Sequence, residues 1–273
     1  MASPTEITTR QLSRLIGTPD CPIIVDVRID EDFDDDPRMI PGSFRHPYLE
    51  LDTLVERLNG QPTIIYCQKG FKISQGVAAM LRAGNVASET VEGGHFAWRD
   101  AGFPLLNPAK LPERNRAGQT VWVTRHRPKI DRIACPWFIR RFLDPTAQFM
   151  FVEPGQVTNV ADRFDATPFD VEDVFWSHRA DQCTFDTMIA EFGIEIDALD
   201  RLATIVRGAD TNRHDLAPEC TGLLAASLGL SRMYRDDLAQ LDAGLMLYDA
   251  FYRSARDATS EGHDWPASLN KDQ

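Results

Sequence analysis

A single cysteine, Cys67, follows an apolar segment and opens a short cationic loop. The run at 62–66 contains mostly apolar and β-branched residues, which predicts a buried strand that ends just before the thiol. Gly70 permits a tight turn with positive φ, and an amphipathic helical pattern follows. The backbone amides of such a loop converge on one point, so these amides, the helix N-terminus, Lys69 and Lys72 would stabilise a thiolate or a bound anion. This context favours a nucleophilic cysteine over a small buried hydrophobic residue.

The elements that would position Cys67 alternate between strands and helices. We expect strands at 21–27, 62–66 and 86–91, a first helix capped by Thr8 or Thr9, and a second helix over 49–58. This alternation predicts an α/β fold with a parallel sheet, in which the run at 62–66 is a central strand.

Three further segments, residues 24–28, 40–43 and 91–98, accompany the Cys67 loop. In order and spacing they resemble the rhodanese (sulfurtransferase) family over roughly residues 5 to 106. The resemblance implies a parallel sheet flanked by helices and a loop cysteine that accepts a sulfane sulfur as a persulfide and hands it to a thiol or cyanide. Cys67 would be this catalytic nucleophile. The substrate-binding residues that we expect beside it are Gln68, Lys69, Gly70, Phe71, Lys72 and Arg28.

The fifth and sixth residues after Cys67 bear on which anion this loop could bind. Rhodaneses often have arginine five residues after the cysteine, whereas this chain has Lys72, which keeps the charge but lacks the planar bidentate fork. The related cysteine phosphatases need arginine six residues after the cysteine, and Ile73 occupies that position. The sequence therefore argues against phosphatase chemistry.

The composition indicates two domains. The 273 residues, 43% of them hydrophobic, suffice for two cores of about 100 to 150 residues each. No apolar run approaches bilayer length, and the N-terminus has neither a basic start nor an apolar stretch, so we expect a cytoplasmic protein without a membrane partner. We expect a rhodanese-like domain at 1–106, a linker at 107–119, a second domain at 120–257 and a mobile tail at 258–273.

The five cysteines lie at least 37 positions apart, which indicates reduced thiols rather than disulfides or a zinc ribbon. The net charge of −12 disfavours nucleic acid as a partner. Residues 110–141 nevertheless carry nine Lys or Arg against two acidic residues, which indicates either an oxyanion-facing patch or a solvated stretch paired with the acidic remainder. Residues 30–36 include six acidic residues and are expected to form a solvated loop, with a cation site as the less favoured alternative.

The second half has mixed strand and helix patterns. Strands are expected at 120–124, 149–152 and 171–177, and a helix begins at Asp131 and stops before Pro145. Further helices are expected at 185–192, 198–206, 219–228 and 236–256. The pattern predicts an α+β, helix-rich second domain.

Residues 130–137, 177–186, 208–211 and 218–219 resemble the C-terminal domain of the chromate-resistance protein ChrB, over roughly residues 120 to 256. The resemblance implies a regulatory or accessory role in resistance to chromate. Better-known members carry a DNA-binding N-terminal half, and this chain has a rhodanese-like half instead. That difference argues against a repressor.

Polar residues of the second half offer two further candidate sites. His178, Cys183, Asp210 and Glu219 form a mixed donor set that would suit Zn²⁺ or a similar divalent metal. Alternatively, the histidine makes structural hydrogen bonds and the glutamate stabilises a helix N-terminus. Arg125, Arg127 and Arg132 would bind an oxyanion or pair with Asp131 and Asp144.

Two functions follow from these patterns. The first is a sulfurtransferase that needs no cofactor, takes a small-molecule sulfur donor and a thiol acceptor, and is linked to chromate, oxyanion or metal stress through its second domain. The second is a chromate- or redox-responsive sensor or regulatory binding protein, in which Cys67 changes state without turnover. Catalytic turnover distinguishes the two, and the sequence leaves the oligomeric state open.

Overall fold

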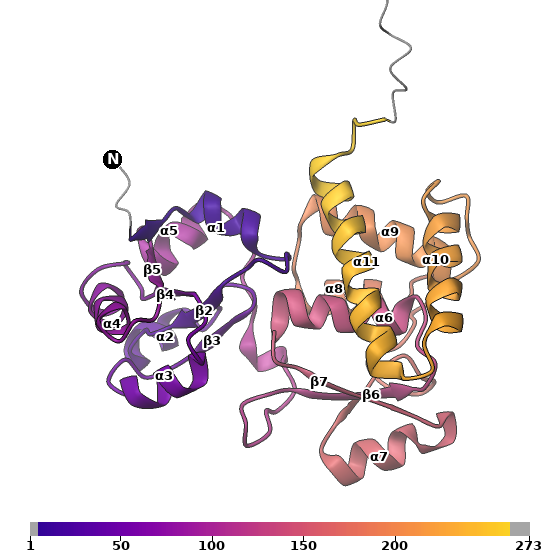
Figure 1. Ribbon diagram of the computed structural model, residues 1–273, viewed down its shortest axis with the longest axis horizontal. Helices are drawn as coiled ribbons and strands as arrows, with labels where there is room; N and C mark the ends of the chain where they lie inside the picture. Colours follow the sequence, from indigo (N-terminus) through magenta and orange to yellow (C-terminus); the bar gives the residue numbers. More distant parts are fainter. Residues whose placement is uncertain (1–4, 263–273) are drawn as a thin grey trace, which may run out of the picture.

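The computed structural model describes residues 5–262, whose two halves lie side by side (Figure 1). Residues 1–4 and 263–273 lie outside the described residues, and with them most of the tail expected at 258–273. None of the helices within the described range combines the length and apolarity that crossing a bilayer requires.

The N-terminal half is built on a five-stranded sheet in the order β1-β5-β4-β2-β3, with every neighbouring pair parallel. Its strands are β1 (Glu6–Ile7), β2 (Ile23–Asp26), β3 (Ser43–Arg45), β4 (Thr63–Tyr66) and β5 (Ser88–Val91). Its helices are α1 (Thr9–Leu15), α2 (Asp30–Asp35), α3 (Leu51–Leu58), α4 (Lys72–Ala83) and α5 (Gly94–Asp100). The predicted parallel sheet flanked by helices is confirmed.

The central strand β4 is buried on both faces. Ile64 and Tyr66 belong to the core that includes residues of α1 and α5, whereas Ile65 and Cys67 belong to the core with α3 and α4. Successive side chains of a strand point to opposite faces. The alternation therefore directs Cys67 to the α3 and α4 side of the sheet.

The acidic run at 30–36 is mostly a helix, where the sequence predicted a loop. Residues Asp30–Asp35 form α2, and three of the carboxylates lie in its first turn, where the positive end of the helix dipole stabilises negative charge. Asp36 follows the helix and pairs with Arg38 at 2.7 Å. The run is thus part of the folded structure next to the sheet.

The C-terminal half has a small parallel sheet beneath a layer of helices (Figure 1). Its strands, in the order β7-β6-β8, are β6 (Val121–Arg125), β7 (Gln148–Val152) and β8 (Thr167–Pro168). Helix α7 (Val157–Phe164) covers one face. The other helices are α6 (Asp131–Phe138), which a π-helical turn (Ile139–Leu143) extends, α8 (Thr184–Phe192), α9 (Asp197–Asp210), α10 (Cys220–Met233) and α11 (Asp237–Asp257). The predicted helix-rich α+β half is confirmed.

The third strand of this half lies earlier than the sequence predicted. Residues 171–177 form turns and bends, and one isolated bridge joins Phe169 to Trp176. Asp170 and Asp173 have φ values of 52° and 60°, in the left-handed region, which a regular strand does not contain. The prediction of a strand at 171–177 was therefore wrong, and β8 takes its place.

The two halves share a buried interface. The amide of Gly42 donates to the carbonyl of Phe142 at 2.6 Å. The backbone of Gly17 lies so close to Phe142 and Tyr252 that an added Cβ would be 2.5 Å from the first ring and 2.9 Å from the second. Aromatic side chains of the C-terminal half thus pack directly against the backbone of the N-terminal half.

The segment expected as a linker is ordered against the C-terminal half. It contains a 3₁₀ turn (Pro108–Lys110), and the Nζ atom of Lys110 donates to the carbonyl of Glu191 at 2.5 Å. Arg114 pairs with the buried carboxylate of Asp144 at 3.0 Å. The connection therefore contacts the second half instead of spanning a gap between independent bodies.

Candidate functional site

Cys67 directly follows β4, and its side chain is 5% exposed. Its Sγ atom lies 3.2 Å from the hydroxyl of Ser74, which in turn donates to the carbonyl of Phe71 at 3.2 Å. Within residues 5–262, the backbone amides of 68–73 donate to no acceptor of the protein. Six consecutive unpaired amides beside a thiol can serve as a cradle for an anion.

Helix α5 holds the carbonyl side of this loop. The amide of His95 donates to the carbonyl of Cys67 at 2.9 Å, and the amide of Phe96 donates to that of Gln68 at 3.0 Å. Gly70 provides the turn that the loop requires, with a φ of 73°. The loop carbonyls are thus bonded to the first turn of α5, while the loop amides remain unpaired.

A pocket of about 880 Å³ lies over the thiol, and Gln68, Lys69, Phe71 and Lys72 line it together with Cys67. Both lysines are exposed at its edge. The remaining lining is one carboxylate, Asp32, and otherwise mainly apolar: Ile29, Tyr48, Leu51, Ile73, Gly76, Val77 and Met80. The pocket therefore combines positive charge with an apolar wall.

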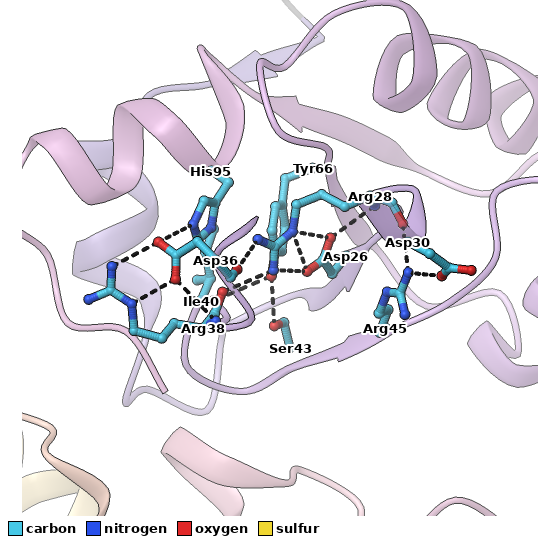
Figure 2. Close-up of polar contacts among 10 residues, drawn as sticks. All are labelled: Asp26, Arg28, Asp30, Asp36, Arg38, Ile40, Ser43, Arg45, Tyr66 and His95. Atoms are coloured by element: carbon cyan, nitrogen blue, oxygen red, sulfur yellow. Dashed lines mark hydrogen bonds and ion pairs between the residues drawn. The ribbon is translucent and has the colours of Figure 1, made fainter. Parts of the chain in front are cut away.

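Arg28, expected among the substrate-binding residues, is instead bonded within the protein (Figure 2). Its side chain is fully buried, its Nε atom lies 2.8 Å from the Asp26 carboxylate, and it also donates to the carbonyls of Asp36 and Arg38 at 2.7 and 2.9 Å. It is absent from the lining of the Cys67 pocket. The guanidinium therefore stabilises the segment after β2 and has little capacity left for a substrate.

A second polar group beside Arg28 joins α2 to α5 (Figure 2). The Nε2 atom of His95 lies 3.2 Å from the Asp36 carboxylate, which also pairs with Arg38. The bonds from Arg38 hold the pKa of Asp36 well below its usual range. Burial, together with the charge of Arg28, lowers the pKa of His95, so its imidazole is neutral at pH 7.

In the C-terminal half, three carboxylates converge on one imidazole. The Nε2 atom of His178 lies 3.3 Å from Asp131, 3.4 Å from Asp170 and 3.3 Å from Asp210. Asp131 and Asp170 are buried, whereas the His178 side chain is 42% exposed. The structure thus brings together two of the four residues predicted to bind metal, His178 and Asp210.

Sequence reasoning missed Asp131 and Asp170 as members of this cluster. Asp131 accepts the amides of Thr184 and Phe185 at the N-terminus of α8, at 2.6 and 3.2 Å. Asp170 accepts the hydroxyl of Thr184 at 3.0 Å. Burial raises the pKa of Asp131, and the facing carboxylates, Asp131 first, raise the pKa of His178. The sequence did contain a signal for Asp131, because this carboxylate begins a predicted helix and lies in a segment that resembles the ChrB C-terminal domain.

The other two residues of the predicted metal set make different contacts. Cys183 is buried and caps α8, with its Sγ atom 3.2 Å from the Asp186 carboxylate. Glu219 is an exposed residue that precedes α10. Neither side chain belongs to the group of donor atoms at His178. The predicted set therefore does not form one site.

The three arginines predicted to bind an oxyanion also separate. Arg125 and Arg132 both pair with Asp170, at 3.3 and 3.2 Å. Arg127 instead donates to the carbonyls of Ser231 and Tyr234 at the C-terminal end of α10. They pair with neither Asp131 nor Asp144, the alternative partners considered from the sequence, and they form no common anion cluster.

The comparisons with known proteins agree with this division. The rhodanese-like domain model matches residues 8–101, and the ChrB C-terminal domain model matches residues 122–255. The chain therefore joins a rhodanese-like domain to a ChrB C-terminal domain.

Protein ChrB from Cupriavidus metallidurans is 29% identical over 191 residues, which cover 65% of this chain and 57% of ChrB. Among solved structures, a rhodanese-like domain protein from Staphylococcus aureus is 32% identical over 34% of this chain and 90% of its own, with a TM-score of 0.29. A protein of unknown function from Rhodopseudomonas palustris, described as a possible tyrosine phosphatase, is 25% identical over 37% of this chain and 83% of its own, with a TM-score of 0.32.

Proposed function

We propose that this chain is a sulfurtransferase in which Cys67 carries a persulfide. The observation that carries the proposal is the run of unpaired amides at 68–73 beside the buried thiol. Preorganised amides stabilise an anion without reorganisation, which is often the largest electrostatic contribution in such sites. The match of residues 8–101 to the rhodanese-like domain supports the same chemistry.

The reaction has two displacement steps. In the first, the Cys67 thiolate attacks the sulfane sulfur of a donor such as thiosulfate, the donor's S–S bond breaks, and sulfite leaves with the bonding pair. The new bond leaves a persulfide anion on Cys67. In the second, an acceptor thiolate or cyanide attacks the outer sulfur, and the Cys67 thiolate is released. The amides of 68–73 would hold the anion in both steps, and Lys69 and Lys72 at the pocket edge would attract the anionic donor.

We infer that the second domain links this transfer to chromate or metal stress. The match of residues 122–255 to the ChrB C-terminal domain supports that assignment. A sensor without turnover is the alternative, because a reactive cysteine in a cradle would serve either role. Repeated turnover by one molecule separates the two functions.

The test is a thiosulfate:cyanide sulfur-transfer assay on the full chain, with intact-protein mass spectrometry of the same sample. We expect repeated turnover and a mass gain of one sulfur atom, both lost in Cys67→Ser. Cys21→Ser is the control, because Cys21 is more accessible than Cys67, yet burial raises the pKa of its thiol to about 12. Absence of turnover with several sulfane donors in the folded wild type would refute the proposal.

A further inference from the structure

The cluster at His178 is not explained by a protonated imidazole alone. The Nε2 atom carries at most one hydrogen, and three carboxylates face it. Charge-assisted N–H···O bonds have a donor–acceptor distance of about 2.7–2.9 Å. The three contacts here are 3.3–3.4 Å long. The spacing is wider than a shared proton requires.

The spacing does match the distance between two ligands of one metal ion. Ligands that bind about 2.1 Å from an ion at a near-tetrahedral angle lie about 3.4 Å apart. One donor atom each from Asp131, Asp170 and His178 lie within 4.8 Å of one another. The three donors can therefore approach a common ion with small side-chain movements.

We propose that Asp131, Asp170 and His178 bind a first-row divalent cation such as Zn²⁺ or Mn²⁺, with Asp210 as the fourth side chain at the ion. One imidazole nitrogen together with carboxylate oxygens is a donor set that both ions accept. The site differs from the set suggested by the sequence, because Asp131 and Asp170 take the places of Cys183 and Glu219. It does not depend on sulfur transfer at Cys67.

The surroundings orient the carboxylates as outer partners of metal ligands commonly do. The amides of Thr184 and Phe185 fix Asp131, and the Thr184 hydroxyl and the two arginine partners fix Asp170. The histidine is the accessible member of the set, with 42% of its side chain exposed. It provides the route by which an ion reaches the buried oxygens.

The experiment counts metal in the intact chain. The purified protein is stripped with a chelator, dialysed, and titrated with ZnCl₂ or MnCl₂ by calorimetry, and bound metal is measured by mass spectrometry. We expect one ion per chain. We expect His178→Gln and Asp210→Asn to weaken binding by at least about 10-fold, since even outer partners of metal ligands contribute that much.

Two variants make the result specific. Asp210→Asn tests the site with little risk to folding, because the only ion pair of this carboxylate among the described residues is with His178. Glu219→Gln is the control: it alters an exposed carboxylate outside the cluster and should bind with unchanged affinity. Circular dichroism verifies the fold of each variant.

Failure of the wild type to bind either ion would overturn the proposal. The three carboxylates would then be held together by a protonated His178 and not by a metal ion. Unchanged affinity in folded His178→Gln would overturn it as well. Cys67→Ser should lose sulfur transfer and keep metal binding, so failure of either proposal is distinguishable from failure of the other.

Discussion

Gly70 and Gly94 are in direct backbone contact: a Cβ added to Gly94 would lie 2.4 Å from the amide nitrogen of Gly70. The reverse contact is equally close, because a Cβ on Gly70 would lie 2.6 Å from the amide nitrogen of Gly94. Both residues also have positive φ, of 73° and 60°. The loop that presents Cys67 is therefore held against α5 by two positions that only glycine can occupy without strain.

We expect Gly94→Ala to lower the free energy of unfolding by roughly 1–3 kcal/mol, through strain at positive φ and a clash with the Cys67 carbonyl. The rate of sulfur transfer should fall by more than the fraction of folded protein does, because the loop amides of 68–73 are displaced from the thiol. Gly229→Ala is the control, since this glycine of α10 has no atom within 4 Å of an added Cβ and lies outside the Cys67 pocket. Denaturant titration and the transfer assay measure the two effects. Equal behaviour of both variants would contradict the prediction.

Lys72→Arg should improve the use of thiosulfate. The lysine offers a point charge at the edge of the pocket, whereas a guanidinium can make two parallel bonds to an oxyanion. We expect KM for thiosulfate to fall about 3- to 10-fold, equivalent to roughly 1 kcal/mol, with a smaller change in kcat. Steady-state kinetics measure this, and Lys69→Arg serves as the comparison. An unchanged KM for Lys72→Arg would show that position 72 does not contact the donor, and a rise in KM would contradict the prediction.

Arg28→Ala should be strongly destabilising. Its removal leaves the carboxylate of Asp26 buried without a countercharge, which costs about 3–5 kcal/mol in comparable buried pairs. Arg38→Ala removes an arginine whose side chain is 49% exposed, and its effect should be about 1 kcal/mol or less. Urea unfolding of the two variants gives the comparison. Normal stability with a raised KM for the sulfur donor in Arg28→Ala would instead restore Arg28 as a substrate-binding residue.

The contribution of His95 to stability should decrease as the pH falls through about 6.5, the ordinary pKa of histidine, because this imidazole is held neutral in the folded state. His178, whose pKa the facing carboxylates raise, contributes with the opposite sign, so the contribution of His95 is obtained by comparison with a variant. The pKa of His95 is lowered mainly by burial and by Arg28, while the facing carboxylates of Asp36 and Asp26 oppose the shift. The unfolded chain thus binds more protons below that pH, and the contribution is fully present above it. Chemical denaturation between about pH 5.5 and pH 8, roughly the range in which histidine titrates, measures how the free energy of unfolding depends on pH. The difference in free energy of unfolding between wild type and His95→Gln should change as the pH falls through this range, in the direction of a less stable wild type, and a constant difference would exclude this contribution of His95.

The Cys67 loop could be predicted from the sequence because its parts are contiguous. The strand, the cysteine, Gly70 and the helix follow one another within residues 62–83, so local pattern alone places the thiol. The pairing of Arg28 with Asp26 could not be predicted this way, because the same arginine could equally have faced a substrate.

The cluster at His178 was only half predicted for a related reason. Its members come from four separate segments, and their proximity depends on how α6, α8 and α9 pack. Cys183 is near His178 in the chain, yet the start of α8 commits its thiol to Asp186. The third strand of that half was also misplaced, because the apolar residues within 171–177 suggested a strand, whereas Asp170 and Asp173 adopt left-handed conformations in the folded structure.

The contact of Phe142 with both Gly17 and Gly42 bears on how the chain unfolds. One aromatic residue supplies its ring and its carbonyl to the opposite half, so neither half can open without exposing apolar surface of the other. We therefore expect the two halves to melt together in a single calorimetric transition. A fragment cut at the connection would lose thermal stability even though its own sheet is complete.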